Sequence, residues 1–174
     1  NLENIVIPES VTSIGDVAFH GCTFQNITIP KSVTSIEGSA FTNCNKLQTM
    51  NVDGDNHVYD SRNNCNAIIE TATNKLVSGC RKTIIPNSVS SIGRGAFGND
   101  TIDLIIIPES ITFIDDLAFW GSMTHKDSKI IFKSSIPPTF GKEVFYSKSG
   151  TMYVPIGCKE TYIMANEECK YFKI

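Results

Sequence analysis

The stretch LENIVIPESVTSIGDVAFHGC, residues 2–22, recurs almost letter for letter as FQNITIPKSVTSIEGSAFTNC, residues 24–44. Matching positions lie 22 residues apart, as Pro8 and Pro30 show. A period of roughly 20 to 29 residues is typical of a solenoid, in which each unit stacks on the next. The sequence therefore specifies an architecture much more clearly than it specifies a function.

Each repeat contains three short apolar segments joined by turns. In the first repeat, residues 5–7 alternate between inward and outward side chains, which predicts a short strand. Pro8 ends this strand because proline cannot donate a hydrogen bond to a ladder. Residues 11–14 supply the second apolar segment and residues 18–19 the third. Together the three segments describe one coil.

Equivalent positions in successive coils carry the same kind of side chain, so stacking places like on like. Fully burying one such side chain contributes roughly 1.5 to 3 kcal/mol, and we expect these ladders to form the core. The ladders are Ile7, Ile29, Val52, Ile85, Ile107, Phe132 and Val154; Ile14, Ile36, Ile92, Ile114 and Phe140; and Phe19, Phe41, Phe97, Phe119 and Phe145.

The third coil departs from the repeat over about residues 53–80. Pro86 follows Pro30 by 56 residues instead of 44, which indicates an insertion. Residues 67–70 and 75–78 flank a polar turn and predict a β-hairpin. The array of about seven coils then extends to residue 155.

Cys65 and Cys80 of the hairpin either form a disulfide or remain free thiols. The pairs expected across the turn are Ile68 with Val77, Ile69 with Leu76 and Cys65 with Cys80. A disulfide between Cys65 and Cys80 needs Cα atoms about 5.5 to 6 Å apart. However, Cys80 also occupies the inward slot of Leu2, where a buried thiol packs as a small hydrophobe. Six cysteines suit either redox compartment.

Residues 156–174 abandon the repeat and form a C-terminal cap. The sequence KETYIMANEECKYF within them predicts a short helix over about residues 159–165. A helix after the last strand would cover the open end of the stack, which otherwise exposes the interior of a coil.

Composition and motifs exclude several functions. The net charge is −3 with both signs interspersed, so no basic face suggests nucleic acid. No apolar run approaches the roughly 18 to 20 residues of a membrane-spanning helix. No GxSxG, HExxH, P-loop or GxGxxG motif occurs, and His20, His57 and His125 are not spaced as metal ligands. We expect no catalytic residue, no metal site and no cofactor.

One outward residue lies between the two inward residues of each strand. This row is Val6, Thr28, Asn51, Ile84, Ile106, Ile131 and Tyr153. Its last four members are apolar, and because parallel strands lie about 4.8 Å apart, we expect them to form a continuous strip. Exposed apolar strips tend to mark partner surfaces. The alternative is that β-branched residues simply favour strands.

A second candidate site is the position after each ladder phenylalanine. Trp120, the only tryptophan, stands there, and Tyr146 follows it one coil later. Aromatic residues outside core slots are typical contact residues. The alternative is that Trp120 folds back onto its own coil.

The unit LxxIxIPxSVTSIGxxAFxxC resembles the leucine-rich repeats of the BspA type, which occur in bacterial surface proteins. VYDSRNNCNAIIETATNKL (residues 58–76) and YVPIGCKETY (residues 153–162) also resemble segments of such proteins from gut Bacteroidales. The resemblance covers nearly the whole chain. It implies a β-rich leucine-rich-repeat solenoid, a right-handed superhelix whose concave parallel sheet is built from the IxIP strands. The cap differs in having Cys169 where such caps often have tryptophan.

The resemblance also implies secretion or exposure on the bacterial cell surface. The chain begins inside a repeat at Asn1, so we expect the export signal upstream. Members of the family are usually described as adhesins or protein-binding modules. We therefore expect a non-enzymatic, adhesin-like module that binds a host or bacterial surface protein or glycan. The alternative is a structural spacer that displays another domain of a longer surface protein.

Overall fold

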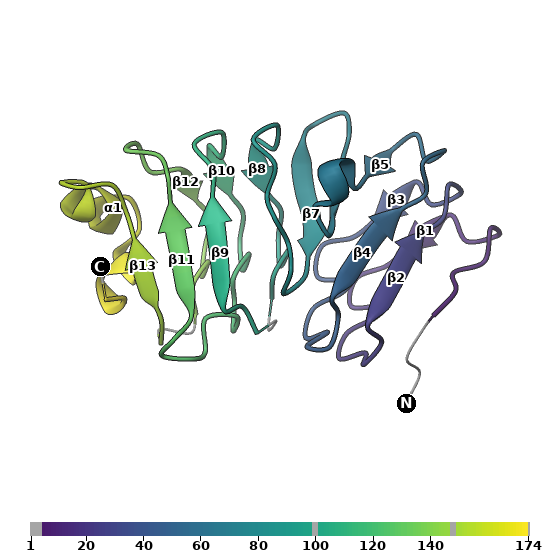
Figure 1. Ribbon diagram of the computed structural model, residues 1–174, viewed down its shortest axis with the longest axis horizontal. Coiled ribbons are helices and arrows are strands. Elements are labelled where there is room, and N and C mark those ends of the chain that lie inside the picture. Colours follow the sequence, from purple (N-terminus) through teal and green to yellow (C-terminus); the bar gives the residue numbers. More distant parts are fainter. Residues whose placement is uncertain (1–4, 99–100, 147–148, 174) are drawn as a thin grey trace.

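The structure, a computed structural model, describes residues 5–98, 101–146 and 149–173. It is a β-solenoid whose coils succeed one another along the long axis, with β1 and β2 near one end and the helix α1 at the other (Figure 1). The expected fold is confirmed. Leu2, the first apolar position of the repeat, lies outside the described residues.

The longer strands of the regular coils form one face, which we call the strand face. Its strands are β2 (Asn26–Ile29), β4 (Thr49–Val52), β9 (Leu104–Ile107), β11 (Lys129–Phe132) and β13 (Thr151–Tyr153). β2 pairs with β4, and β9, β11 and β13 form a second sheet. All these pairs are parallel and align equivalent positions of successive repeats.

Two strands expected on this face do not form. Residues 5–7 and 83–86 are not in strands, although they carry the IxIP sequence. In the paired coils, Asp53 N–H donates to Ile29 and Lys133 N–H donates to Ile107, at 2.9 and 3.0 Å. The coils that follow residues 5–7 and 83–86 have Pro30 and Pro108 at this position, and proline has no N–H to donate. Proline alone does not prevent pairing, since β11 pairs with β13 although Pro155 holds the same position.

A second face consists of two-residue strands. β1 (Ser13–Ile14) pairs with β3 (Ser35–Ile36), and β10 (Phe113–Ile114) pairs with β8 (Ser91–Ile92) and β12 (Thr139–Phe140). Each pair is parallel and in repeat register. The second apolar segment of the repeat therefore forms its own ladder.

The insertion joins this second face. After β5 (Tyr59–Asp60) and a short 3-10 turn, η1 (Arg62–Asn64), the hairpin strands are β6 (Ala67–Glu70) and β7 (Lys75–Gly79). β7 runs parallel to β8, whereas β6 is antiparallel to both β5 and β7. Figure 1 shows β7 between the β2–β4 pair and the sheet that starts at β9. The predicted hairpin is confirmed.

The register of the hairpin differs from the expected one. Ile69 pairs with Leu76 as expected, but Ile68 pairs with Ser78 instead of Val77. The cause is an irregularity between Ile68 and Ile69, which leaves Val77 as the extra residue of a β-bulge.

The hairpin divides the interior into two cores. Ile68 and Val77 pack into an N-terminal core that contains the coils before the insertion. Ile69 and Leu76 pack into a C-terminal core that contains the coils after it. All four side chains are buried, so the hairpin is a partition with apolar residues on both faces.

The expected ladders are confirmed as core. Their members are buried, except for Val52, Val154, Phe19 and Phe140, which are partly buried and pack against the cores. The phenylalanine rings stack: Phe97 lies 5.0 Å from Phe119 between ring centroids. Phe19 and Phe41 stack in the same way at 5.2 Å.

A third edge follows the ladder phenylalanines, and we call it the turn edge. Here the second coil contacts the fourth directly, because Asn43 N–H donates to Gly98 at 2.9 Å. Thr101 N–H also donates to Asn45 Oδ1 at 3.2 Å. The hairpin therefore separates the second coil from the fourth at the strand face but not at the turn edge.

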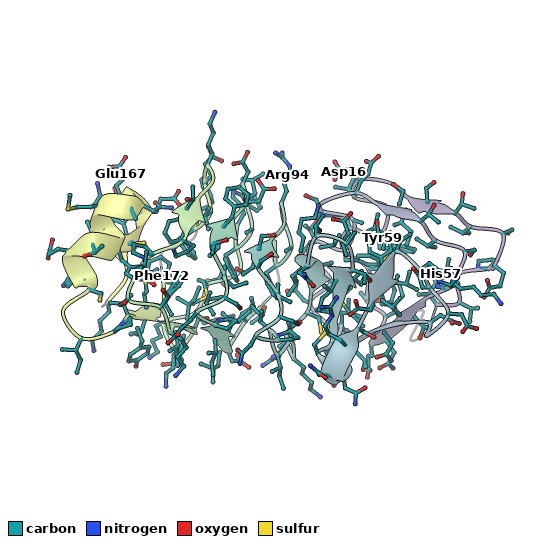
Figure 2. All side chains as sticks on the ribbon, turned by 90° about the horizontal axis from the view of Figure 1, so that it is seen from above. Asp16, His57, Tyr59, Arg94, Glu167 and Phe172 are labelled. Atoms are coloured by element: carbon teal, nitrogen blue, oxygen red, sulfur yellow. The ribbon has the colours of Figure 1, made fainter. Side chains whose placement is uncertain are left out.

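Two side chains of the insertion close the N-terminal half. Asn56 Nδ2 donates to the carbonyl oxygens of Pro30 and Val33, at 2.9 and 3.0 Å. Tyr59 OH accepts a hydrogen bond from Ile36 N–H at 2.9 Å. Figure 2 shows Tyr59 among the side chains of the N-terminal half. These groups replace the strand that the third coil lacks.

The C-terminal cap consists of α1 (Lys159–Ala165), as expected, and the 3-10 helix η2 (Glu167–Tyr171). The buried Tyr162 donates its hydroxyl hydrogen to Ser134 O at 2.8 Å. Glu168 Oε2 accepts a hydrogen bond from Phe145 N–H. In other coils, the N–H of the ladder phenylalanine donates to the next coil instead.

Phe172 and Cys169 complete the cap from the inside. Phe172 lies beside the cap (Figure 2) and its ring meets Phe145 edge-on, 5.3 Å between centroids. Cys169 is fully buried in the C-terminal core. A thiol therefore fills the position at which the resemblance has tryptophan.

Candidate functional site

The outward row predicted on the strand face is exposed. Tyr153 is 46% and Ile106 44% exposed, and Ile131 between them is partly exposed. The register of β11 sets Ile131 directly beside Ile106 on one side and Tyr153 on the other. These three side chains form a continuous apolar strip, which we call the apolar row.

Ile84 is exposed, as predicted, but does not continue this row in a sheet. It is 73% exposed and lies in the unpaired segment 83–87. A groove of about 680 Å³ lies between this segment and residues 104–110, and we call it the β9 groove. Ile84 therefore lies outside the paired strands that set Ile106, Ile131 and Tyr153 side by side, and its continuity with them stays a prediction.

Apolar and polar side chains both line the β9 groove. Ile84 lines one wall, and Leu104 and Ile106 line the other. The polar lining residues include Thr83, Asn87, Glu109 and Lys133. The groove therefore offers apolar contact together with polar and charged side chains.

Sequence reasoning missed Leu104 as a site residue. It is exposed and lies two residues before Ile106 on the same face of β9. The uninterrupted run Leu104–Ile107 was the available signal, because alternation places its first and third residues outward together.

The second candidate pair is brought together on the turn edge. The rings of Trp120 and Tyr146 stack with centroids 5.2 Å apart and planes 24° apart. Tyr146 is exposed and Trp120 is partly buried. The pair is thus adjacent, as the repeat spacing predicted, but it lies on a different edge from the apolar row.

The expected disulfide alternative is not formed. Cys65 packs into the C-terminal core and Cys80 into the N-terminal core. The Cys65 thiol lies 3.7 Å from Ala67 O, and the Cys80 thiol lies 3.4 Å from Asn66 O. The bulge in the hairpin shifts the register that would set the two cysteines opposite each other. Burial raises the pKa of the Cys65 thiol.

Other functional groups are sparse. Within residues 5–98, 101–146 and 149–173, no cluster of three or more His, Cys, Asp or Glu side chains could hold a metal ion. No helix in these same residues has the length and apolar character needed to cross a membrane.

The chain matches one family over almost its full length. The family described as BspA type leucine rich repeat region matches in six copies, over residues 1–124 and 68–171. No curated protein matches the chain.

Two solved structures are similar to the fold. A leucine-rich repeat protein from Eubacterium ventriosum has a TM-score of 0.69 and 22% identity, over 85% of this chain and 41% of that one. A leucine rich cell surface protein from Faecalibacterium prausnitzii has a TM-score of 0.59 and 28% identity, over 76% of this chain and 36% of that one. The chain spans less than half the length of either protein.

Proposed function

This chain belongs to the BspA-type leucine-rich repeat family, and we propose that it is a non-enzymatic binding module whose strand face captures a protein partner. The observation that carries the proposal is the apolar row, in which Ile106, Ile131 and Tyr153 are outward and in register on adjacent strands. Apolar area removed from water contributes about 25 cal/mol per Å². A partner that covers the row gains this stabilisation.

The proposed location is the bacterial cell surface or the secreted fraction. Its support is the sequence resemblance to bacterial surface proteins and the similar structure from Faecalibacterium prausnitzii, which is described as a cell surface protein. The export signal in this proposal lies upstream of Asn1.

A protein fits the apolar row better than a glycan does. Sugar hydroxyl groups need hydrogen-bonding partners when they leave water, and within the apolar row only the Tyr153 hydroxyl offers one. A glycan would find its aromatic surface instead at the Trp120–Tyr146 stack on the turn edge. The two ligand classes therefore predict two different sets of sensitive residues.

The competing function is a structural spacer. Its support is that the chain spans 41% and 36% of the two similar structures, so that an array of this kind forms part of longer proteins. A spacer needs only the stacked cores, and substitutions of its outward residues would have no effect on binding.

The test measures capture of purified extracellular-matrix proteins and mucin on a biosensor surface. The row variant combines Ile106→Ser, Ile131→Ser and Tyr153→Ser, and the control combines Val6→Ser with Asn51→Ser. The control residues occupy the same repeat position in coils without the row. We expect the row variant to lose capture of a matrix protein and the control to retain it, with unchanged thermal unfolding in both.

Three results would overturn the proposal. Equal capture by the row variant would exclude the row, and loss of mucin binding only on Trp120→Ala with Tyr146→Ala would favour a glycan at the turn edge. Absence of capture by the unmodified chain would favour the spacer.

A further inference from the structure

β9 presents an unpaired backbone edge to the β9 groove. Its other edge is used: Lys129 N–H donates to Asp103 at 2.8 Å and Lys133 N–H to Ile107 at 3.0 Å. Because parallel strands bond through alternate residues, Leu104 and Ile106 direct their N–H and C=O groups away from β11. No backbone hydrogen bond joins this edge to residues 83–87, all of which the structure describes.

The neighbouring segment bonds to the insertion and not to this edge. Ile84 N–H donates to Cys65 O at 2.9 Å, on the side of the hairpin.

β4 shows the same edge when it is occupied. β2 lies along it in parallel register, from Asn26 beside Thr49 to Ile29 beside Val52. Thr49 N–H donates to Gln25 at 3.2 Å. The β4 residues that bond to β2 hold the same repeat positions as the β9 residues whose backbone groups have no strand partner.

The groove also offers apolar surface to the side chains of a strand. Its volume is about 680 Å³, and the exposed side chains of Ile84, Leu104 and Ile106 line it. An extended segment bonded to the open edge of β9 would bring its alternate side chains against these residues.

We propose that the β9 groove binds an extended peptide segment of the partner, which adds to β9 as a parallel strand. This deepens the proposed function and rests on it. In strand addition the backbone hydrogen bonds provide affinity, and pockets for alternate side chains provide specificity. Segments with alternating β-branched residues are the partner class that fits.

The probe is a fluorescein-labelled synthetic peptide, FQNITIPKS, which has the sequence of residues 24–32 and presents the edge that β2 offers to β4. Fluorescence anisotropy measures its binding to the full chain, and NMR measures amide hydrogen exchange of the chain. We expect binding to slow exchange at Leu104 and Ile106 by at least about tenfold. A peptide of the same composition in scrambled order should leave both amides unchanged.

Backbone methylation separates strand addition from side-chain docking. N-methylation of the peptide at the residues corresponding to Ile27 and Ile29 removes the donors that would face β9, and we expect it to abolish binding. N-methylation at the residue corresponding to Thr28, whose N–H faces away, should retain binding. Equal binding of both methylated peptides would overturn the proposal.

Substitutions in the chain provide the second control. Ile84→Ser with Ile106→Ser should weaken peptide binding at least about tenfold, and Val6→Ser should leave it unchanged. Val6 has the same repeat position and is 86% exposed, but it lies in the first coil.

Several results would refute strand addition. They are no binding at a peptide concentration of about 1 mM, binding without protection of Leu104 and Ile106, and protection that grows with the concentration of the chain alone, which would indicate self-association. Capture of a matrix protein through Ile131 and Tyr153 without protection at β9 would refute only this inference. The proposed function would then stand.

Discussion

Gly79 stands in the place of a ladder phenylalanine, directly against the ring of Phe97. Its N–H donates to Ala96 O at 2.9 Å, just as Phe97 N–H donates to Ala118 O at 2.8 Å in the next coil. A Cβ atom at position 79 would overlap the Phe97 ring and come within 2.9 Å of Thr83 Oγ1. The hairpin therefore enters the phenylalanine ladder only because its last residue has no side chain.

Gly79→Ala should destabilise the chain by about 1 to 3 kcal/mol, because a methyl group in a filled core forces its neighbours to shift. Urea unfolding measures the free energy change. Gly15→Ala is the matched control, since no atom lies within 4 Å of the added Cβ. Equal stability of the two variants would contradict this role of Gly79.

Tyr59→Phe should cost about 1 to 3 kcal/mol, because it removes the acceptor of Ile36 N–H and leaves a buried donor unpaired. The same urea experiment measures it. Tyr153→Phe alters an exposed tyrosine and should leave stability unchanged. If Tyr59→Phe were neutral, the edge of β3 would not depend on this hydroxyl.

Stability should fall as the pH rises above 9. Burial raises the pKa of the Cys169 thiol from 9.0 to about 12, so the folded state retains a proton that the unfolded chain has lost. The unfolding free energy should therefore decrease by up to about 1.4 kcal/mol per pH unit between these values. Below pH 9 this group makes no pH-dependent contribution.

Urea unfolding at several pH values between 8 and 10.5 tests the assignment to Cys169. Cys169→Ala should lower stability near neutral pH, because it leaves a cavity, and flatten the decline at alkaline pH. Cys158→Ala removes a partly exposed thiol and should retain the steep decline. A decline of the same slope in both variants would assign it to other groups.

Arg62→Lys should destabilise the insertion by about 1 kcal/mol, because lysine cannot form a two-pronged bond to a carboxylate. Arg62 donates to both oxygens of Asp60, at 2.7 and 2.6 Å, and to Asn74 Oδ1 at 2.8 Å. It thereby joins the start of the insertion to the hairpin turn. Arg81→Lys is the control, since the Arg81–Asp103 pair is more exposed and should matter less.

The effect of Arg62 should depend on pH in a defined direction. Burial alone would raise the pKa of Asp60, but hydrogen bonds from Arg62 and Thr71 outweigh it and lower the pKa below 3.8. The stabilisation is therefore complete above pH 3.8 and is lost as the pH falls through the lowered value. The difference between wild type and Arg62→Lys should shrink in the same range. A constant difference would contradict the ion pair as its cause.

The repeat period was sufficient to predict the solenoid, its ladders and the hairpin. Residues such as Ile29, Ile107 and Phe119 recur at fixed intervals, and only stacking buries all of them. The helix over Lys159–Ala165 also followed from the sequence, because the repeat pattern ends before it.

The bulge and the β9 groove could not be predicted in the same way. The bulge depends on how Ile68 and Val77 fit a core that lies on the other side of the hairpin from Ile69. The groove depends on Ile84 bonding to Cys65, which is a contact outside the repeat. Both result from tertiary packing around the one irregular coil.

The backbone conformation at the turn edge also could not be predicted from the sequence. Val17, Ser39, Gly95 and Leu117 occupy the same repeat position and all have φ between 51° and 67°. Of these four residues, only Gly95 is of a type that indicates a left-handed conformation. The pattern becomes visible only when the coils are superposed in three dimensions.

The measurement that tests the proposed binding surface most directly is hydrogen exchange of the chain with and without a captured matrix protein. We expect slower exchange at β9, β11 and β13, with β2 and β4 unchanged. Slower exchange confined to the turn edge around Trp120 and Tyr146, or no change along the strand face, would contradict it.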